Sequence, residues 1–285
     1  MVQQVDANGS GIEKLIGLLR MLRDRKHGCP WDLEQSIVSL VPYTLEEVYE
    51  VVDAIENDDM VELEDELGDL LFQVVFYAQI AEEHGYFNFE NVADAISNKL
   101  IRRHPHVFPQ GDVHQFARKT DITTEEVVVN WEAIKEVERA EKRKRGSNLT
   151  STQPLSILDD VPRALPALER ARKLQKRAAT VGFDWQEIAP VVAKLKEEIA
   201  EFEEALESND QQQVSNELGD ILFAAVNLAR HSAVEPEVAL RSANKRFAER
   251  FKWIESTLTS RGQQIKQTNL AELEALWDQA KQTGL

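Results

Sequence analysis

LKEEIAEFEEAL at residues 195–206 and NELGDILFA at 216–224 form the motif around which the rest of this chain is arranged. An earlier copy reads TLEEVYEVVDAI at 44–55 and DELGDLLFQ at 65–73. In both copies apolar residues recur at intervals of three and four, which is typical of amphipathic α-helices. Each copy therefore predicts two consecutive helices, and the duplication predicts two domains of similar plan.

Each copy carries four acidic residues in two pairs. Within a pair the residues lie three positions apart, so they share one face of a helix. The pairs are Glu47 with Glu50 and Glu66 with Asp69 in the first copy, and Glu198 with Glu201 and Glu217 with Asp220 in the second. The offset between the copies is constant, because 198 − 47 and 220 − 69 both equal 151. Two antiparallel helices would direct four such carboxylates into one small volume.

Converging carboxylates repel one another by kilocalories per mole at the dielectric constant of a protein interior, so they need solvent, protons or a metal ion. We expect Mg²⁺, with Mn²⁺ as a second choice, because both prefer oxygen ligands in octahedral geometry. The absence of His and Cys from the motifs argues against zinc. A single acidic motif is more often a solvated helix face, but its repetition favours a metal site.

A glycine lies between the acidic residues of each second helix. Leu67-Gly68 in the first copy recurs as Leu218-Gly219 in the second. Glycine inside a helix costs about 1 kcal/mol relative to alanine. We therefore expect another helix to approach closely at both glycines.

Composition limits the class of protein. The chain has 285 residues and a net charge of −17, which disfavours binding to nucleic acids or to anionic membranes. The one cysteine, Cys29, cannot form an intrachain disulfide and fits a reducing compartment. Residues 1–11 lack the features of a signal peptide, and the longest apolar run, near 67–81, is interrupted by polar residues. We expect a cytoplasmic protein without a membrane span.

Helical periodicity extends over almost the whole chain and sustained strand alternation is missing, so the predicted fold class is all-α. A break in composition at residues 146–156 predicts a flexible linker, taken to 158, between helical-bundle domains at 1–145 and 159–285. Helices are predicted at about 12–25, 43–57, 59–84, 89–103 and 124–145, and then at about 163–180, 187–208, 210–231, 235–261 and 269–282.

Cations and an aromatic residue recur as well. The pairs are Lys99 with Lys245, Trp131 with Trp277 and Lys135 with Lys281, each separated by 146 positions, as in 245 − 99. Taken singly, such residues are usually solvated lysines and core tryptophans. Beside two acidic sets they match the needs of a nucleoside triphosphate, namely metal ions and cations for the phosphates and a flat ring for the base.

Several longer motifs occur in a fixed order: GCPWD at 28–32, PYTLEEVYEVVDAI at 42–55, ELGDLLFQVVFYAQIA at 66–81, RRHPHVF at 102–108, NWEAIK at 130–135, DDVPRALPALERARKLQKRAATVGFDW at 159–185 and LWDQAK at 276–281. With these motifs the sequence resembles the MazG family of nucleoside triphosphate pyrophosphohydrolases, in the all-α NTP pyrophosphatase superfamily. The resemblance covers nearly the whole chain. In this combination the motifs are highly specific.

The resemblance implies Mg²⁺-dependent hydrolysis of standard as well as noncanonical NTPs and dNTPs to the monophosphate and pyrophosphate, for nucleotide-pool control or house-cleaning. It also implies a homodimer with sites near the subunit contacts. The implied metal ligands are Glu198, Glu201, Glu217 and Asp220, with Glu47, Glu50, Glu66 and Asp69 as first-domain counterparts. The implied substrate contacts are Lys194, Glu198, Arg246, Arg250, Trp277 and Lys281.

The first domain departs from this pattern. Tyr43, Leu100 and His104 stand where the second domain has Lys194, Arg246 and Arg250, although Arg102 and Arg103 lie close by. We therefore expect the second domain to be the main catalytic one. Glu197 or Glu198 would take the proton of the attacking water, and Arg246, Arg250 and Lys281 would stabilise the departing diphosphate. The carboxylate motif predicts no covalent enzyme intermediate.

Two other interpretations remain. One is a related chemistry, such as that of phosphoribosyl-ATP pyrophosphohydrolase or a dUTPase-like enzyme, which a panel of nucleotides would distinguish. The other is a non-enzymatic, acidic helical partner-binding protein, which would show no Mg²⁺-dependent turnover. Apolar residues on more than one side of the helices at 70–81 and 221–229 predict partners on two faces. A homodimer in which like domains pair would provide them.

Overall fold

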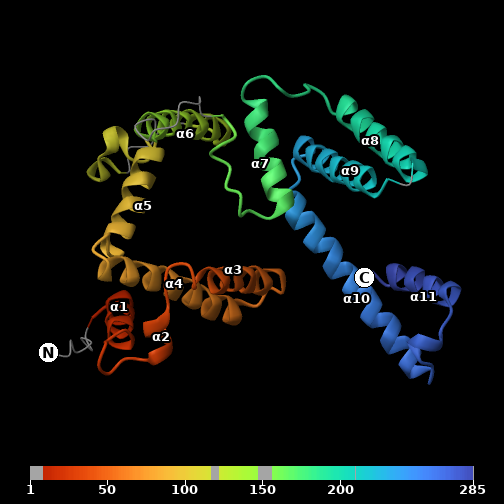
Figure 1. Ribbon diagram of the computed structural model, residues 1–285, viewed down its shortest axis with the longest axis horizontal. Helices are drawn as coiled ribbons and strands as arrows, with labels where there is room; N and C mark the ends of the chain where they lie inside the picture. Colours follow the sequence, from red (N-terminus) through yellow and green to blue (C-terminus); the bar gives the residue numbers. More distant parts are fainter. Residues whose placement is uncertain (1–8, 117–121, 147–155, 209, 285) are drawn as a thin grey trace. The chain divides into compact units, whose positions relative to one another are not determined.

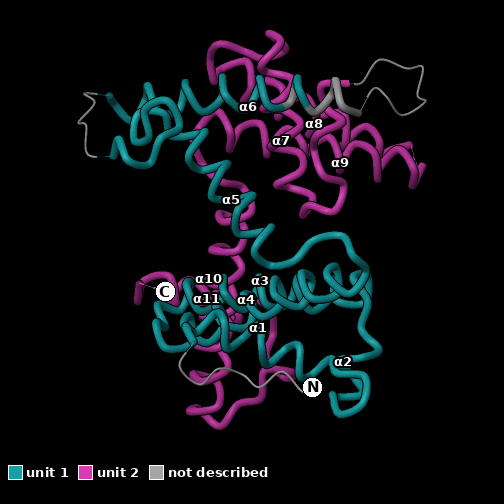
Figure 2. Tube along the Cα trace, turned by 90° about the vertical axis from the view of Figure 1, so that its left-hand side faces the viewer, with its two compact units in different colours: residues 1–148 teal, residues 149–285 magenta. Residues whose placement is uncertain are grey.

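The computed structural model describes residues 9–116, 122–146, 156–208 and 210–284. These residues form eleven α-helices and three short 3₁₀ helices, with no β-strand among them, so the all-α prediction is confirmed (Figure 1). The chain divides into two compact units, residues 1–148 and 149–285, coloured separately in Figure 2. No helix in the described ranges is long and apolar enough to cross a membrane.

Unit 1 is built around the longest of its helices, α4. Its α-helices are α1 (Gly11–Leu22), α2 (Pro30–Glu34), α3 (Val41–Glu56), α4 (Met60–Glu83), α5 (Phe89–Arg103) and α6 (Thr124–Gly146), with 3₁₀ helices at Pro109–Gly111 and Val113–Gln115. Helix α4 packs against α1, α3 and α5. The buried core joins Leu19 of α1 and Leu40 to Val75, Phe76 and Ile80 of α4. This packing fixes the face of α4 that is left for the acidic residues.

The GCPWD motif ends helix α1. The amide of Cys29 donates a hydrogen bond to the carbonyl oxygen of Leu22 at 2.8 Å, and the Arg23 guanidinium donates to the carbonyl oxygen of Asp32. A Cβ atom at Gly28 would lie 2.3 Å from the Leu22 oxygen, so this return of the chain requires glycine. The predicted extension of the first helix to residue 25 is wrong because the chain folds back earlier.

Unit 2 repeats the acidic hairpin and adds a long helix. Its helices are α7 (Ala167–Ala179), α8 (Ile188–Ser208), α9 (Gln211–His231), α10 (Pro236–Ser260) and α11 (Leu270–Gln282), with a 3₁₀ helix at Ile265–Gln267. Helix α9 packs against α8 and α7, while α11 packs on α10 around buried Ile254, Leu258 and Leu276. Both views show α11 at the opposite end of unit 2 from α8 and α9 (Figures 1 and 2).

The two acidic hairpins begin their second helices with the same cap. The side chain of Asp59 accepts hydrogen bonds from the backbone amides two and three residues later, and Asp210 does the same at the start of α9. A cap of this kind contributes about 1 kcal/mol and fixes where the helix begins. The repeated cap therefore gives both hairpins the same register between their acidic residues.

Most predicted helices agree with the structure to within a few residues. The predicted helix at 163–180 begins instead at Ala167, because Pro166 caps it with φ −49° and ψ 144°, outside the helical region. The five-residue α2 was not predicted, because it is too short to show a period. Of the predicted linker at 146–156, residues 147–155 lie outside the described parts of the chain.

Candidate active site

Three of the four predicted metal ligands of the second copy lie together in unit 2. Glu198 and Glu201 project from α8 and Glu217 from α9, and one carboxylate oxygen of each lies within 4.8 Å of the others. Glu198 is only 7% exposed. Asp220, one turn after Glu217 on α9, lines a cavity together with Glu198. The hairpin thus gathers the acidic residues as their spacing of three predicts.

Lys194 brings a positive charge to this cluster from one turn earlier on α8. Its Nζ lies 2.8 Å from a carboxylate oxygen of Glu198 and 2.9 Å from one of Glu197. Hydrogen bonds to Glu198 and then to Glu197 raise the pKa of Lys194 above its usual value. Desolvation raises the pKa of Glu201; Lys194 opposes this change, and Glu198 adds to it. The cluster therefore holds repelling carboxylates around one fixed cation.

A cavity of about 630 Å³ opens beside the cluster. It is bounded by α7, α8, α9 and the segment between α7 and α8, where Phe183 and Trp185 border it. Lys194, Glu198 and Asp220 line the same cavity. This volume is within the range of small-molecule sites in proteins. An organic group bound in the cavity would be adjacent to the carboxylates.

Two buried amides also line the cavity. Gln175 donates from Nε2 to the carbonyl oxygen of Phe223 at 2.8 Å, and its Oε1 has no hydrogen-bond partner among the described residues. Asn227 accepts from the Arg230 guanidinium at its Oδ1. Arg230 in turn donates to Asp184 at 2.8 Å and thereby lowers the pKa of Asp184 to about 2. Both amides are therefore held in fixed orientations.

Sequence analysis did not identify Gln175 or Asn227. The signal for Gln175 was its place four residues after Ala171 and three before Ala178, where the helical period puts apolar residues. Asn227 could have been found by comparing the two copies. The equivalent position in the first copy, 227 − 151 = 76, is the apolar Phe76. Polar residues at such inward positions are informative because they need partners.

Unit 1 contains a similar cluster without the lysine. One carboxylate oxygen each of Glu47, Glu66 and Asp69 lies within 4.8 Å of the others. Desolvation, and then the charge of Asp69, raises the pKa of Glu47. Desolvation, and then the charge of Glu50, raises the pKa of Glu66. Tyr43 occupies the position of Lys194, so no cation at that position offsets the repulsion.

Larger side chains stand beside the unit 1 cluster. Gln73 and Phe76 occupy the positions equivalent to Ala224 and Asn227, since 224 − 151 = 73 and 227 − 151 = 76. Gln73 is 5% exposed and Phe76 is 0% exposed, and Gln73 donates to Glu47 at 3.3 Å. The larger side chains thus occupy the region that forms the cavity wall in unit 2.

The remaining predicted substrate contacts lie on the other two helices of unit 2: Arg246 and Arg250 on α10, and Trp277 and Lys281 on α11. The Trp277 ring packs 5.2 Å from that of Phe247 and 5.4 Å from the Arg250 guanidinium. Lys281 pairs with Asp278 at 3.0 Å. Because α11 lies at the other end of unit 2 from α8 and α9 (Figure 2), this group is not brought to the carboxylates within the unit.

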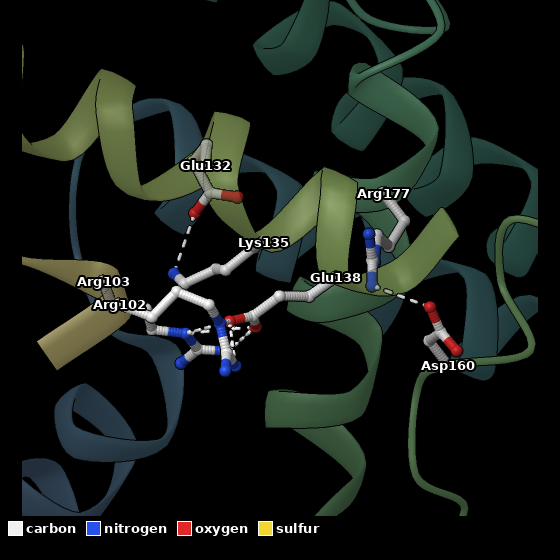
Figure 3. Close-up of polar contacts among 7 residues, drawn as sticks. All are labelled: Arg102, Arg103, Glu132, Lys135, Glu138, Asp160 and Arg177. Atoms are coloured by element: carbon white, nitrogen blue, oxygen red, sulfur yellow. Dashed lines mark hydrogen bonds and ion pairs between the residues drawn. The ribbon is translucent and has the colours of Figure 1, made fainter. Parts of the chain in front are cut away.

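The arginines near the substituted positions of unit 1 are already paired. Arg102 and Arg103 each place Nη2 2.6 Å from a carboxylate oxygen of Glu138 on α6 (Figure 3). Hydrogen bonds from Arg103, and also from Arg102, lower the pKa of Glu138 to about 2. Lys135 pairs with Glu132 at 3.2 Å. Arg102 and Arg103 thus hold α6 on α5, whereas the pair of Lys135 with Glu132 lies within α6.

The expected close approach of another helix at the two interior glycines is not found within either unit. A Cβ atom at Gly68 or at Gly219 would meet no described atom within 4 Å. Both glycines therefore face open space next to the acidic clusters. Packing inside either unit therefore does not explain why glycine, which destabilises a helix interior, stands at these two positions.

Comparison with known proteins agrees with the site. The MazG nucleotide pyrophosphohydrolase domain matches residues 35–108 and 186–254, which contain both acidic hairpins. The fold and the duplicated hairpins thus define a nucleotide pyrophosphohydrolase of the all-α class. The nucleoside triphosphate pyrophosphohydrolase of Escherichia coli (strain K12) is 47% identical over 272 residues, 95% of this chain and 97% of its own.

Two further relatives extend the comparison. The nucleoside triphosphate pyrophosphohydrolase/pyrophosphatase MazG of Thermotoga maritima is 41% identical over 271 residues, 94% of this chain and 95% of its own. The nucleoside triphosphate pyrophosphohydrolase of Mycobacterium tuberculosis is 36% identical over 173 residues, 60% of this chain and 46% of its own. The chain belongs to the MazG family.

Proposed function

We propose that this protein is a cytoplasmic enzyme that hydrolyses nucleoside triphosphates to the monophosphate and pyrophosphate. We propose that it accepts standard as well as noncanonical bases with either sugar, and that it serves in nucleotide-pool control or house-cleaning. The observation that carries the proposal is the convergence of Glu198, Glu201 and Glu217 within 4.8 Å beside a cavity of about 630 Å³. The related enzyme of Escherichia coli bears the same activity in its name.

We infer that Glu198, Glu201, Glu217 and Asp220 hold Mg²⁺, with Mn²⁺ as a substitute. Their oxygen atoms are the donors that these ions prefer, and desolvation, which raises the pKa of Glu201, gives a physical reason for a cation to be favourable there. When bound, the ion would neutralise the triphosphate and acidify the attacking water. The first-domain counterparts Glu47, Glu50, Glu66 and Asp69 offer the same chemistry.

The side chains of α8 then supply the proton chemistry. Glu197 or Glu198 takes the proton of the water that attacks the α-phosphorus, and Lys194 holds both carboxylates in place. A lysine so close to the cluster can also contact a phosphate oxygen. Direct attack by water leaves pyrophosphate as the leaving group, without a covalent intermediate.

Cations from a second copy complete the site in this proposal. Arg246, Arg250 and Lys281 would stabilise the departing diphosphate, with Trp277 beside them. Because α11 lies at the other end of unit 2 from α8 and α9 (Figure 2), and Arg250 packs on Trp277 of α11, a partner related by a two-fold axis would supply these groups reciprocally. We therefore propose a homodimer in which like domains pair.

We also propose separate domains at residues 1–145 and 159–285, joined by a linker at 146–158, with the second as the main catalytic domain. Three differences support this division of work. Tyr43 replaces Lys194, the buried and larger Gln73 and Phe76 stand at the positions of Ala224 and Asn227, and the nearby arginines of unit 1 are engaged by a carboxylate of α6.

Product analysis tests the proposal. The full-length protein is incubated with a panel of NTPs and dNTPs, standard and noncanonical, in the presence of Mg²⁺ or of EDTA. We expect the monophosphate and pyrophosphate in equal amounts, with Mg²⁺ only. Direct release of orthophosphate from the γ position would contradict the assignment. Turnover of a phosphoribosyl-ATP or of dUTP alone would identify the narrower chemistry instead.

A further inference from the structure

The cavity in unit 2 also indicates how the substrate's base is held, an inference that rests on the proposed hydrolysis of nucleoside triphosphates. We propose that the cavity bounded by α7, α8 and α9 receives the nucleobase, and that Gln175 and Asn227 hydrogen-bond to its edge. Gln175 accepts a hydrogen bond from an N–H of the base. Asn227 donates one to a ring or carbonyl acceptor.

The position of the cavity favours this occupant. Lys194, Glu198 and Asp220 line it, so a triphosphate bound at the carboxylates would leave its nucleoside part at the cavity. Phe183 and Trp185 border the same space and provide aromatic surface, which bases use for stacking. Flat, largely apolar groups with a polar edge are the chemistry that such a cavity recognises.

Trp277, which the sequence offered as the ring for the base, is already in contact with other side chains. It packs against Phe247 at 5.2 Å and against the Arg250 guanidinium at 5.4 Å, within the cluster that joins α10 to α11. Trp185, in contrast, borders the cavity and is 43% exposed. The cavity therefore offers an aromatic ring of its own.

Gln175 carries the strongest polar signal. It is 8% exposed and lines the cavity, and its Oε1 lacks a hydrogen-bond partner in the described structure. The opposite amide orientation would set Oε1 against the Phe223 carbonyl oxygen, with which Nε2 makes its 2.8 Å hydrogen bond. The amide is thereby fixed with its acceptor unused. Buried acceptors without partners are unfavourable, and an N–H of a bound base would satisfy this one.

Asn227 provides the complementary group. Its Oδ1 accepts from Arg230, and Asp184 fixes Arg230 through two guanidinium nitrogens. The remaining polar group of Asn227, Nδ2, can only donate. One acceptor and one donor match the Watson–Crick edges of adenine and cytosine in one order and those of guanine and uracil in the opposite order. The pair can therefore bind any common base only if the two kinds of base enter the cavity in opposite orientations, which the broad substrate range proposed above requires.

Unit 1 serves as an internal comparison. At the positions of Ala224 and Asn227 it has Gln73 and Phe76, both buried, beside a similar acidic cluster. It therefore has carboxylates for a metal ion, but larger side chains at the two positions that line the cavity in unit 2. Converting Ala224 to glutamine reproduces a side chain that the same fold already accommodates at the equivalent position.

The first experiment removes the acceptor with Gln175→Met, which keeps the length of the side chain. The amino group of adenine is its only N–H in a nucleotide, so ATP is compared with purine riboside triphosphate, which lacks that group. In the wild type we expect the KM of the analogue to exceed that of ATP by about five- to tenfold, the scale of one hydrogen bond. In Gln175→Met, the two KM values should be equal, with kcat changed less than about twofold.

Inorganic tripolyphosphate, used as an inhibitor without a base, separates the base site from the phosphate site. Its Ki should be the same for the wild type and Gln175→Met. Wild-type KM values that are equal for ATP and the analogue would overturn the proposal. So would discrimination that persists in the variant, or a matching rise in the Ki of tripolyphosphate.

The second experiment fills the cavity with Ala224→Gln. The value of kcat/KM for ATP should fall by more than about tenfold, while the Ki of tripolyphosphate and the helical circular dichroism stay unchanged. Ala239→Gln, the same substitution at an exposed site on α10, is the control and should behave as wild type. An unchanged KM in Ala224→Gln would overturn the base site. Failure of the wild type to form pyrophosphate would instead overturn the proposed function.

Discussion

Lys194 is the residue that most clearly separates the two acidic clusters. Its ammonium lies 2.8 Å from Glu198, so it lowers the electrostatic repulsion in unit 2 before any other cation binds. In unit 1 the same position is Tyr43, and the pKa values of Glu47 and Glu66 are raised by desolvation and by neighbouring carboxylates. A carboxylate with a raised pKa binds metal ions less well at low pH, because protons compete. Because desolvation also raises the pKa of Glu201 in unit 2, metal binding at both clusters should weaken as pH falls.

The matched substitutions Glu201→Gln and Glu50→Gln compare the two clusters, because these positions are equivalent in the repeat. We expect Glu201→Gln to lower kcat/KM by more than about tenfold, since losing a ligand should cost at least as much as losing its outer-shell support. The helical fold should persist, because the change removes repulsion. Glu50→Gln should retain most of the activity. Similar losses in steady-state kinetics of the two variants would show that both domains contribute comparably.

The helices were predictable because their signals are local. An apolar stripe with a period near 3.6 is visible in the sequence without knowledge of what packs on it, and the caps at Asp59 and Asp210 fix the starts of α4 and α9. The boundaries that were wrong depend on contacts at a distance. Residues 23–25 leave the helix because the chain at Gly28 folds back onto Leu22.

The candidate site was predictable only in part for the same reason. The acidic residues could be identified from their spacing within two adjacent helices. The cavity wall, in contrast, combines Gln175 of α7 with Asn227 of α9 and Trp185 of the segment between α7 and α8. Their proximity follows from tertiary packing, which no spacing encodes. The open space at Gly68 and Gly219 was misjudged because the sequence does not say which face of a helix is covered.

The contact between α5 and α6 gives a prediction at the level of these elements. Figure 3 shows the carboxylate of Glu138 on α6 paired with both Arg102 and Arg103 of α5. These contacts lower the pKa of Glu138 from 4.5 to about 2. A lowered pKa means that the pair contributes stability above the ordinary pKa and loses it as pH falls toward the folded value. Glu138→Gln should therefore speed amide hydrogen exchange in α6 near neutral pH.

The size and pH dependence of this effect make the test specific. Partly exposed ion pairs contribute up to about 1 kcal/mol, so protection in α6 should fall by up to about fivefold. The difference between the wild type and Glu138→Gln should shrink at about pH 3 and vanish near pH 2. Glu141→Gln, an exposed position on the same helix, is the control. A difference that is independent of pH would contradict the assignment to the ion pairs.

For the whole molecule the central question is how a chain of net charge −17 binds a polyanion. In the proposed mechanism, metal ions at the acidic cluster would neutralise part of the charge of the triphosphate, and the cations of α10 and α11 would neutralise the rest if they reach the phosphates. Within unit 2, α11 lies at the opposite end from α8 and α9 (Figure 1). The acidic helix α9 also exposes Leu218 and Leu222, at 47% and 52%, next to the open space at Gly219. A second copy would cover this apolar face and supply the cations together.

Assembly and complementation test this arrangement. Light scattering at micromolar concentration should give the mass of two chains. Leu222→Glu should dissociate the dimer and abolish activity, whereas Val238→Glu, at an exposed apolar residue of α10, should leave both unchanged.

If carboxylates and cations come from different copies, mixing inactive Glu201→Gln with inactive Arg246→Ala should restore activity. Half of randomly exchanged dimers are mixed and each has one intact site, so recovery should approach about one quarter of the wild type. A one-chain mass with full activity would exclude the dimer, and a dimer without recovery would place all catalytic groups in one copy.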